Sequence, residues 1–117
     1  MEAATIQLDY TLTTRKGFDE TVQAVIDGVA ANAFRVLYVH DVQGTFKEKG
    51  FDREPYKIIE VCNVKYAKQA WEKDLLIGLM MPCKINVYTD NGLTKVSLMR
   101  PSLLAGFFPA AGLQSLG

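Results

Sequence analysis

The chain has 117 residues, of which 49% are hydrophobic and 22% charged, which is the composition of one packed globular domain. Thirteen basic and thirteen acidic side chains cancel, which excludes the strongly basic surface that nucleic acid or an anionic membrane attracts. No apolar run reaches the roughly 18 residues of a membrane span, and the opening segment MEAATIQLDY lacks the pattern of a secretory signal. We therefore expect a single domain over residues 1–117, located in the cytoplasm with both cysteines reduced.

The N-terminal part predicts a strand followed by a long helix. Residues 4–12 alternate apolar and polar side chains with a period of two, which is typical of a strand. Residues 17–34 place apolar side chains on one helical face. Asp19 and Glu20 fall in the first turn, where the helix dipole favours acids, and Asn32 is the expected end.

The middle of the chain predicts two further strands that flank a short helix. Residues 34–42 are apolar and rich in β-formers, so they predict the second strand. Residues 44–51 indicate a short helical turn that ends at Gly50. Residues 56–63 predict the third strand.

A second long helix follows at residues 64–74, with Asn63 as its N-cap. Its apolar face predicts burial of four side chains, Tyr66, Ala67, Ala70 and Trp71. Residues 75–82 are an apolar connector.

The clearest signal is the hairpin of residues 83–100, in which two alternating strands flank Asn91-Gly92. Antiparallel strands with helices packed on one face predict an α+β two-layer sandwich. A two-residue loop also fixes the register, so that Cys83 lies opposite Arg100. One face then reads Cys83, Ile85, Val87, Val96, Leu98 and Arg100, which is the expected core face.

This register predicts a thiol beside a cation at the rim of the core face. A neighbouring guanidinium stabilises the thiolate of Cys83, which is the nucleophile and the soft-metal ligand. A partly buried Arg100 needs an acid or an anionic ligand as its partner. Glu60 is a candidate if its side of the third strand faces inward, which the alternation of residues 56–63 leaves open.

Cys62 and Cys83 are 83 − 62 = 21 residues apart, yet they lie close in space if the third and fourth strands are antiparallel neighbours. They are then either a working thiol pair or inert core fillers, and a disulfide requires Cα atoms within about 7 Å. His40 is expected near Tyr56, roughly 20 Å from Cys62 at the rise of a strand. We therefore interpret it as a structural hydrogen-bonding residue rather than a metal ligand.

Three methionines, Met80, Met81 and Met99, have the soft thioether that copper prefers, although methionine also fills cores. No spacing matches a zinc site, a phosphate-binding loop, a dinucleotide-binding loop or a hydrolase nucleophile motif.

Six segments in order, RVLYVHDV, KEKGF, PYKIIEVCN, KYAKQA, IGLMMPCKI and SLMRPS, give the chain a resemblance to family 302 of the domains of unknown function. The resemblance covers about residues 34–102. It implies a small α+β domain, similar in outline to the TATA-binding-protein-like folds, that forms a homodimer, and it implies no reaction. The resemblance also implies candidate site residues, which are the two thiols and the His-Asp and Met-Arg-Pro segments that match the family pattern: Cys62, Cys83, His40, Asp41, Met99, Arg100 and Pro101.

The chain departs from the family pattern at its C-terminus. Members usually continue into a long amphipathic helix, whereas this chain has LLAGFFPAAGLQSLG. Either this shorter apolar tail or another subunit is expected to cover the sheet.

Three hypotheses follow, and they favour a binding protein over an enzyme, with no catalytic residue assigned. In the first, a corner of the fold binds a small anionic or soft ligand through Cys62, Cys83, Arg100, Glu60, Met99 and His40. A metal ion such as copper would be held by Cys62 and Cys83. In the second, Arg100 activates a thiol for sulfur transfer or redox chemistry. In the third, the protein is a structural homodimer with inert thiols.

Overall fold

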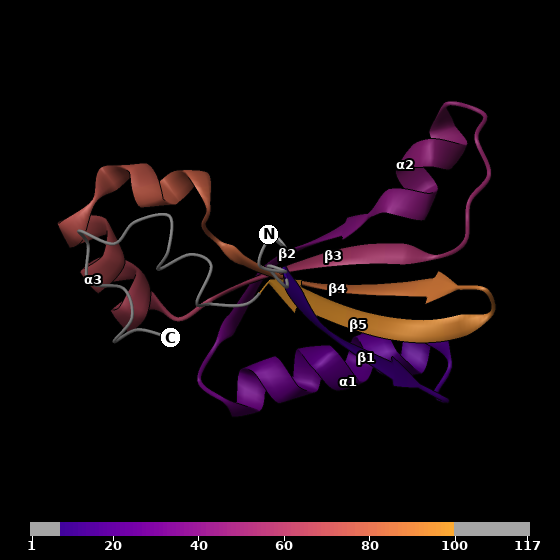
Figure 1. Cartoon of the computed structure of the whole chain (residues 1–117), viewed down its shortest axis with the longest axis horizontal. Coiled ribbons are helices and arrows are strands. Elements are labelled where there is room, and N and C mark those ends of the chain that lie inside the picture. The colour runs from indigo at the N-terminus through magenta and orange to yellow at the C-terminus, as the bar shows by residue number, and fades with distance from the viewer. Residues whose placement is uncertain (1–7, 100–117) are drawn as a thin grey trace, which may run out of the picture.

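The computed structural model describes residues 8–99, which form a five-stranded antiparallel sheet with helices. The strands are Asp9–Thr14 (β1), Arg35–Asp41 (β2), Tyr56–Cys62 (β3), Cys83–Asp90 (β4) and Leu93–Met99 (β5). The helices are Phe18–Ala31 (α1), Val42–Glu48 (α2), Val64–Lys73 (α3) and the 3₁₀ helix Leu75–Leu79 (η1). The spatial order of the strands is β1-β5-β4-β3-β2 (Figure 1). This arrangement confirms the predicted α+β two-layer fold.

Helix α1 lies across one face of the sheet (Figure 1), and the hydrophobic core lies between them. Val22 and Val29 are seven residues apart, so they project from the same side of α1. They pack on Ile59, Val61 and Val87 of the two central strands. Full burial of each such side chain contributes about 1.5–3 kcal/mol, so this face supplies most of the hydrophobic stabilisation.

The hairpin of β4 and β5 has the predicted register. Val87 lies opposite Val96, and Asp90 lies opposite Leu93. The two loop residues have positive φ angles, 53° at Asn91 and 77° at Gly92. Asparagine and glycine tolerate this backbone, which matches the right-handed twist of the strands. The turn therefore sets which side chains of β4 face α1.

Helices α2 and α3 project at opposite ends of the sheet, away from α1 (Figure 1). The Asp41 carboxylate accepts a hydrogen bond from the Gly44 amide and caps α2, which therefore begins two residues earlier than predicted. Asn63 caps α3 as expected, since its side chain accepts from the amides of Lys65 and Tyr66. The prediction that Tyr66 is buried is wrong: it is 48% exposed, because α3 projects beyond the sheet.

The register of β2 against β3 differs from the prediction. His40 lies opposite Ile58 rather than Tyr56. A β-bulge between Val36 and Tyr38 shifts the pairing by adding a residue to one strand only. His40 is therefore four residues of β3 away from the level of Cys62, about 13 Å at the rise of a strand, and not 20 Å.

Candidate functional site

The two thiols lie on opposite sides of the sheet. Strands β3 and β4 are antiparallel neighbours, as predicted, and Val61 lies directly opposite Cys83. Cys83 therefore shares the α1 side with Val61, and Cys62, the next residue, points to the other side. Both cysteines are free. The register thus brings β3 and β4 together, but Cys62 and Cys83 do not form a pair of ligands, because they point to opposite sides of the sheet.

Cys83 is an exposed residue with a free thiol. Its thiol donates a hydrogen bond to the Met81 thioether, with a sulfur–sulfur distance of 3.8 Å. Partial burial of the sulfur raises the pKa of Cys83, the nearby Cys62 raises it further, and Lys84 lowers it. At neutral pH the thiol therefore keeps its proton and is a weak nucleophile. Arg100, on which the predicted thiolate activation depends, and Pro101 lie outside the described residues.

Glu60 does not face the core. It lies on the open face, by which we mean the side of the sheet opposite α1, and its direct cross-strand neighbour there is Lys84. His40 Nε2 approaches Glu60 Oε2 to 3.4 Å, and the Tyr38 ring meets the imidazole edge-on with centroids 4.6 Å apart. Met99 is also on this face, two strands away at β5, where it pairs with Asp9 of β1.

Helix α2 and the open face enclose a hollow of about 330 Å³, which we call the α2 hollow. Six residues line it: His40, Val42, Thr45, Phe46, Ile58 and Lys84. Three of these are apolar, and Lys84 adds a cation. The volume is at the lower end of the range for small-molecule sites, and a mostly apolar lining with a few polar groups is typical of such sites.

The α2 wall of this hollow is held in place by Arg53. Its guanidinium lies 5.6 Å from the centre of the Phe46 ring and 5.2 Å from that of Tyr56. The Gln43 side chain also donates a hydrogen bond of 3.1 Å to the Arg53 carbonyl. A cation between two aromatic rings is attracted to both. Arg53 therefore ties α2 to the start of β3.

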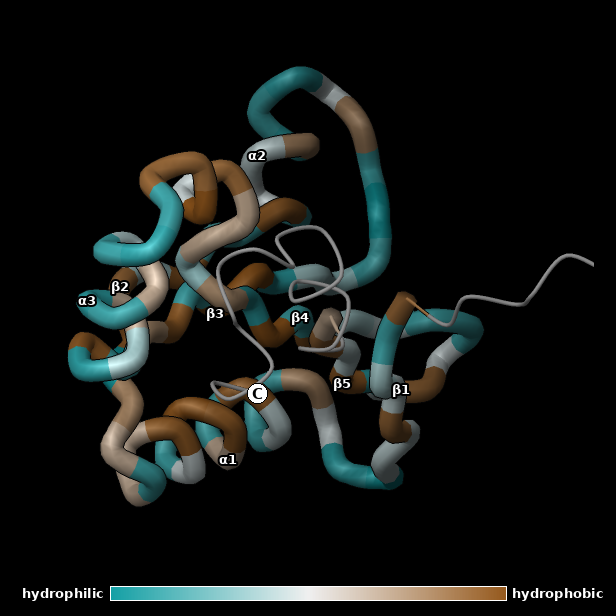
Figure 2. The backbone as a smooth tube through the Cα atoms, turned by 60° about the vertical axis from the view of Figure 1, so that its left-hand side comes forward, coloured by the Kyte–Doolittle hydropathy of each residue, from teal (hydrophilic) through white to brown (hydrophobic). Residues whose placement is uncertain are grey.

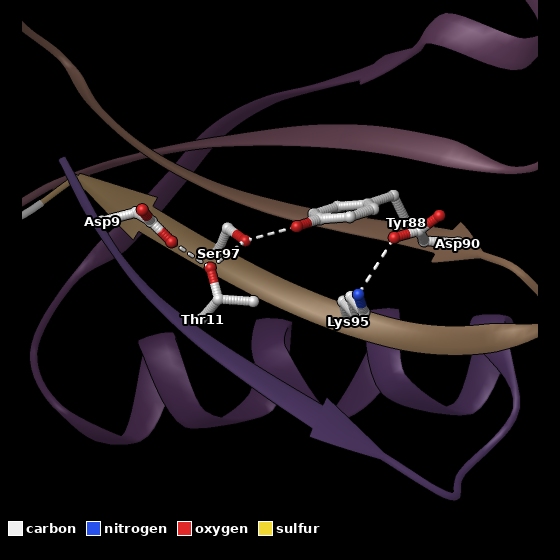
Figure 3. Close-up of polar contacts among 6 residues, drawn as sticks. All are labelled: Asp9, Thr11, Tyr88, Asp90, Lys95 and Ser97. Atoms are coloured by element: carbon white, nitrogen blue, oxygen red, sulfur yellow. Dashed lines mark hydrogen bonds and ion pairs between the residues drawn. The ribbon is translucent and has the colours of Figure 1, made fainter. Parts of the chain in front are cut away.

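Beside the α2 hollow, aromatic and polar side chains cover the open face. The Tyr56 and Tyr88 rings, which are cross-strand neighbours, stack with centroids 5.0 Å apart. Asn86 Nδ2 donates a hydrogen bond of 2.9 Å to the Tyr56 hydroxyl. Lys95 binds the Asp90 carboxylate at 2.9 Å, which closes the end of this face near the hairpin turn (Figure 3).

A chain of hydroxyl groups continues from Tyr88 to the edge strand β1 (Figure 3). The Tyr88 hydroxyl and Ser97 Oγ lie 2.7 Å apart, and Ser97 Oγ is also 2.7 Å from Thr11 Oγ1. Thr11 in turn donates to the Asp9 carboxylate. This network spans three strands. Its hydrogen bonds therefore restrict the side chains of the open face, just as burial restricts the side chains under α1.

A second hollow of about 560 Å³ lies between α3 and η1. Its lining consists of Lys68, Trp71, Glu72, Lys73, Asp74 and Leu75. Two lysines and two carboxylates balance each other, and Lys68 and Glu72 already form an ion pair of 2.8 Å. The lining therefore favours neither an anionic nor a cationic ligand, so this second hollow is a weaker candidate ligand site than the α2 hollow.

Within residues 8–99, no group of three or more His, Cys, Asp or Glu side chains is arranged to hold a metal ion. Among the same residues, no helix is long and apolar enough to cross a membrane.

The fold and sequence together identify the family. The description "Domain of unknown function DUF302" belongs to the family that matches residues 10–116. The chain is also similar to the crystal structure of an uncharacterized conserved DUF302 protein from Bacillus stearothermophilus, with 32% identity and a TM-score of 0.87. The similarity covers 94% of this chain and 87% of that one. The comparison with curated proteins found no match. This chain belongs to the DUF302 family.

Sequence reasoning found His40 but missed the other residues of the α2 hollow. Val42 and Phe46 belong to α2 and Lys84 to β4, and their meeting depends on how α2 leans over the sheet. One signal was available, because the hairpin register already placed Lys84 on the side away from the core.

Proposed function

We propose that this protein is a binding module that takes a small organic anion with an apolar body into the α2 hollow. The observation that carries the proposal is a lysine at an apolar hollow of ligand size. Ile58 and Phe46 offer apolar contact to the body of the ligand, and the ammonium of Lys84 offers a charge-assisted hydrogen bond to its acid group. The proposal keeps the predicted class of ligand, a small anion, and moves its site from Cys62 and Cys83 to the α2 hollow.

Lys84 is available for such a ligand. Its cross-strand neighbour Glu60 is engaged by His40. No carboxylate among residues 8–99 lies within ion-pair distance of the Lys84 ammonium. An anion that enters the hollow therefore meets a lysine that no described acid already neutralises.

Isothermal titration calorimetry with phenylacetate tests this proposal. We expect binding to the wild type, and we expect Lys84→Gln to raise Kd by about tenfold or more, because a hydrogen bond to a charged group contributes about 1.5–3 kcal/mol. Lys95→Gln is the matched control, since Lys95 lies on the same face outside the hollow. The absence of binding to the wild type, or equal Kd values for the two variants, contradicts the proposal.

The sulfur pair of Cys83 and Met81 supports a second candidate, the binding of a soft metal ion such as Cu(I). Thiolate and thioether ligands together select Cu(I). Their separation of 3.8 Å equals the ligand–ligand distance of about 3.8 Å around a four-coordinate ion with metal–sulfur bonds near 2.3 Å. This site keeps Cys83 as a ligand but replaces Cys62 by Met81, because Cys62 points to the other side of the sheet.

Competition with a Cu(I) chelator tests the metal site in reduced protein. We expect Cys83→Ser to lose Cu(I) binding and Cys62→Ser, the matched control, to retain it. A Cys83→Ser variant that competes as well as the wild type rules the site out. Arg100-activated thiol or sulfur-transfer chemistry ranks lower, because the pKa of Cys83 is raised rather than lowered.

We also propose that two copies associate through the segment that follows α3. Leu75 and Leu79 of η1 are each 80% exposed and Leu76 is 62% exposed. The segment between α3 and β4 is mainly hydrophobic (Figure 2), and an exposed hydrophobic patch is typical of an interface. In sedimentation velocity, we expect a dimer that Leu79→Asp converts to monomer and that Leu12→Asp, a control on β1 that is 72% exposed, leaves intact. A wild-type monomer at all concentrations contradicts this.

A further inference from the structure

One polar atom of the open face is left without an interaction. Oδ1 of Asn86 is buried and has no hydrogen-bond partner among the described residues, although Nδ2 of the same amide donates to Tyr56. Buried polar atoms in proteins are nearly always hydrogen-bonded, and leaving one unpaired is unfavourable. An unpaired acceptor next to a candidate ligand site therefore calls for a partner from outside the described residues, and a bound ligand can supply it.

The sheet register places Asn86 at the border of the α2 hollow. Asn86 lies directly opposite Ile58 of β3, and it is two residues from Lys84, so all three side chains are on the open face. Both of those neighbours line the hollow. On its other side Asn86 lies opposite Ser97, which belongs to the hydroxyl network.

In the structure the Asn86 amide is oriented with Nδ2 toward the Tyr56 hydroxyl. Nδ2 is held by the Tyr56 hydroxyl, and the Tyr56 ring is itself stacked on Tyr88 and approached by Arg53. With the amide nitrogen held in this way, Oδ1 is the free acceptor. A ligand group that pairs with it must therefore carry an N–H or O–H donor.

We propose that Asn86 is a specificity-determining residue of the α2 hollow, and that the ligand is an organic acid with a hydroxyl or amino group next to its carboxylate. This rests on the proposed function. The carboxylate binds Lys84, and the neighbouring donor binds Asn86 Oδ1, two residues along the same strand. Because Oδ1 is buried, neighbouring side chains must shift for the donor to reach it.

The same Asn86 explains how such a site separates similar acids. A site built to accept a hydrogen bond rejects an analogue that lacks the donor, because the buried acceptor then stays unpaired. An apolar pocket alone distinguishes ligands of the same shape only weakly. The amide therefore supplies a selectivity that Ile58 and Phe46 cannot.

Three acids with one phenyl ring and one carboxylate test this inference by calorimetry. Phenylacetate has no group next to the carboxylate, mandelate has a hydroxyl there, and phenylglyoxylate has a keto oxygen that only accepts. We expect the wild type to bind mandelate about tenfold more tightly than the other two, since only mandelate pairs the buried acceptor. In Asn86→Leu we expect the three Kd values to be equal.

The outcomes separate the two proposals. Equal affinity for the three acids in the wild type, with the dependence on Lys84 intact, overturns the role of Asn86 and leaves the proposed function standing. A gain for phenylglyoxylate equal to that for mandelate also overturns it, because the site then donates instead of accepting. If none of the three acids binds, the proposed function fails and this inference fails with it. The wild-type comparison decides the matter even where Asn86→Leu does not fold.

Discussion

The two sides of the sheet are filled by different chemistry, although the same strands supply both. Under α1, Ile59, Val61 and Val87 are buried in one hydrophobic cluster. On the open face, Tyr56, Asn86 and Tyr88 of the same two strands form stacked and hydrogen-bonded groups. Alternation along a strand allows this division, because adjacent residues point to opposite faces. One side therefore provides the stability of the fold, and the other is free to provide a ligand site.

The largest expected effect comes from two adjacent isoleucines that differ only in the side they face. Ile59 is fully buried in the core under α1, and Ile58 lies half-buried at the α2 hollow. We expect Ile59→Ala to lower the free energy of unfolding by about 2–5 kcal/mol, because it leaves a cavity in a packed core. Ile58→Ala, the matched control, should lose clearly less. Urea denaturation measures both, and equal losses contradict the division between the two sides.

A smaller effect is expected from the hydroxyl network. Tyr88→Phe keeps the ring that stacks on Tyr56 and removes the hydroxyl that meets Ser97. Ser97 keeps its contact with Thr11, so no buried group is left unpaired. We expect a loss of about 0.5–1.5 kcal/mol in the free energy of unfolding. The control is Tyr66→Phe on the exposed surface of α3, which should change stability by less than about 0.5 kcal/mol; equal losses contradict a role for the network.

The smallest effect concerns the pH dependence of Cys83. Because its pKa is raised in the folded protein, the folded state holds the thiol proton more tightly than the unfolded state. The contribution to stability is therefore complete below the unfolded pKa, near 8.5, and decreases as the pH rises toward the folded value. The rate of iodoacetamide alkylation at Cys83, followed by peptide mass spectrometry, should give an apparent pKa above about 8.5.

A control variant and a contradicting result complete the test of the Cys83 pKa. The Cys83→Ser variant should lose the decline in stability at alkaline pH that the wild type shows. An apparent pKa below that of a free thiol contradicts the assignment, and it restores the hypothesis that Arg100 activates the thiol for sulfur chemistry.

The parts of the fold that short-range rules determine could be predicted from the sequence. A two-residue Asn91-Gly92 turn admits one register, so the side that Ile85, Val87 and Val96 face followed at once. Asn63 likewise marked the start of α3 through its capping side chain. In each case the deciding contact is within a few residues of the signal.

The candidate site depends on contacts between residues that are far apart in the sequence, and no local sequence pattern indicates them. The pairing of His40 was misjudged by two residues, because α2 and a long loop separate β2 from β3 and a bulge shifts the register. The α2 hollow needs the angle at which α2 leaves the sheet, and Arg53 contacts both Phe46 of α2 and Tyr56 of β3 there. Packing of this kind follows from shape rather than from a pattern.

The central claim is that an organic acid binds on the open face, and a map of backbone amide shifts tests it most directly. Titration of ¹⁵N-labelled protein with mandelate should shift the amides of α2 and of the residues around Ile58, Lys84 and Asn86, and leave those of α1 unchanged. Saturable shifts confined to α1, to η1 or to the region of Cys83, or no saturable shifts, would contradict the account.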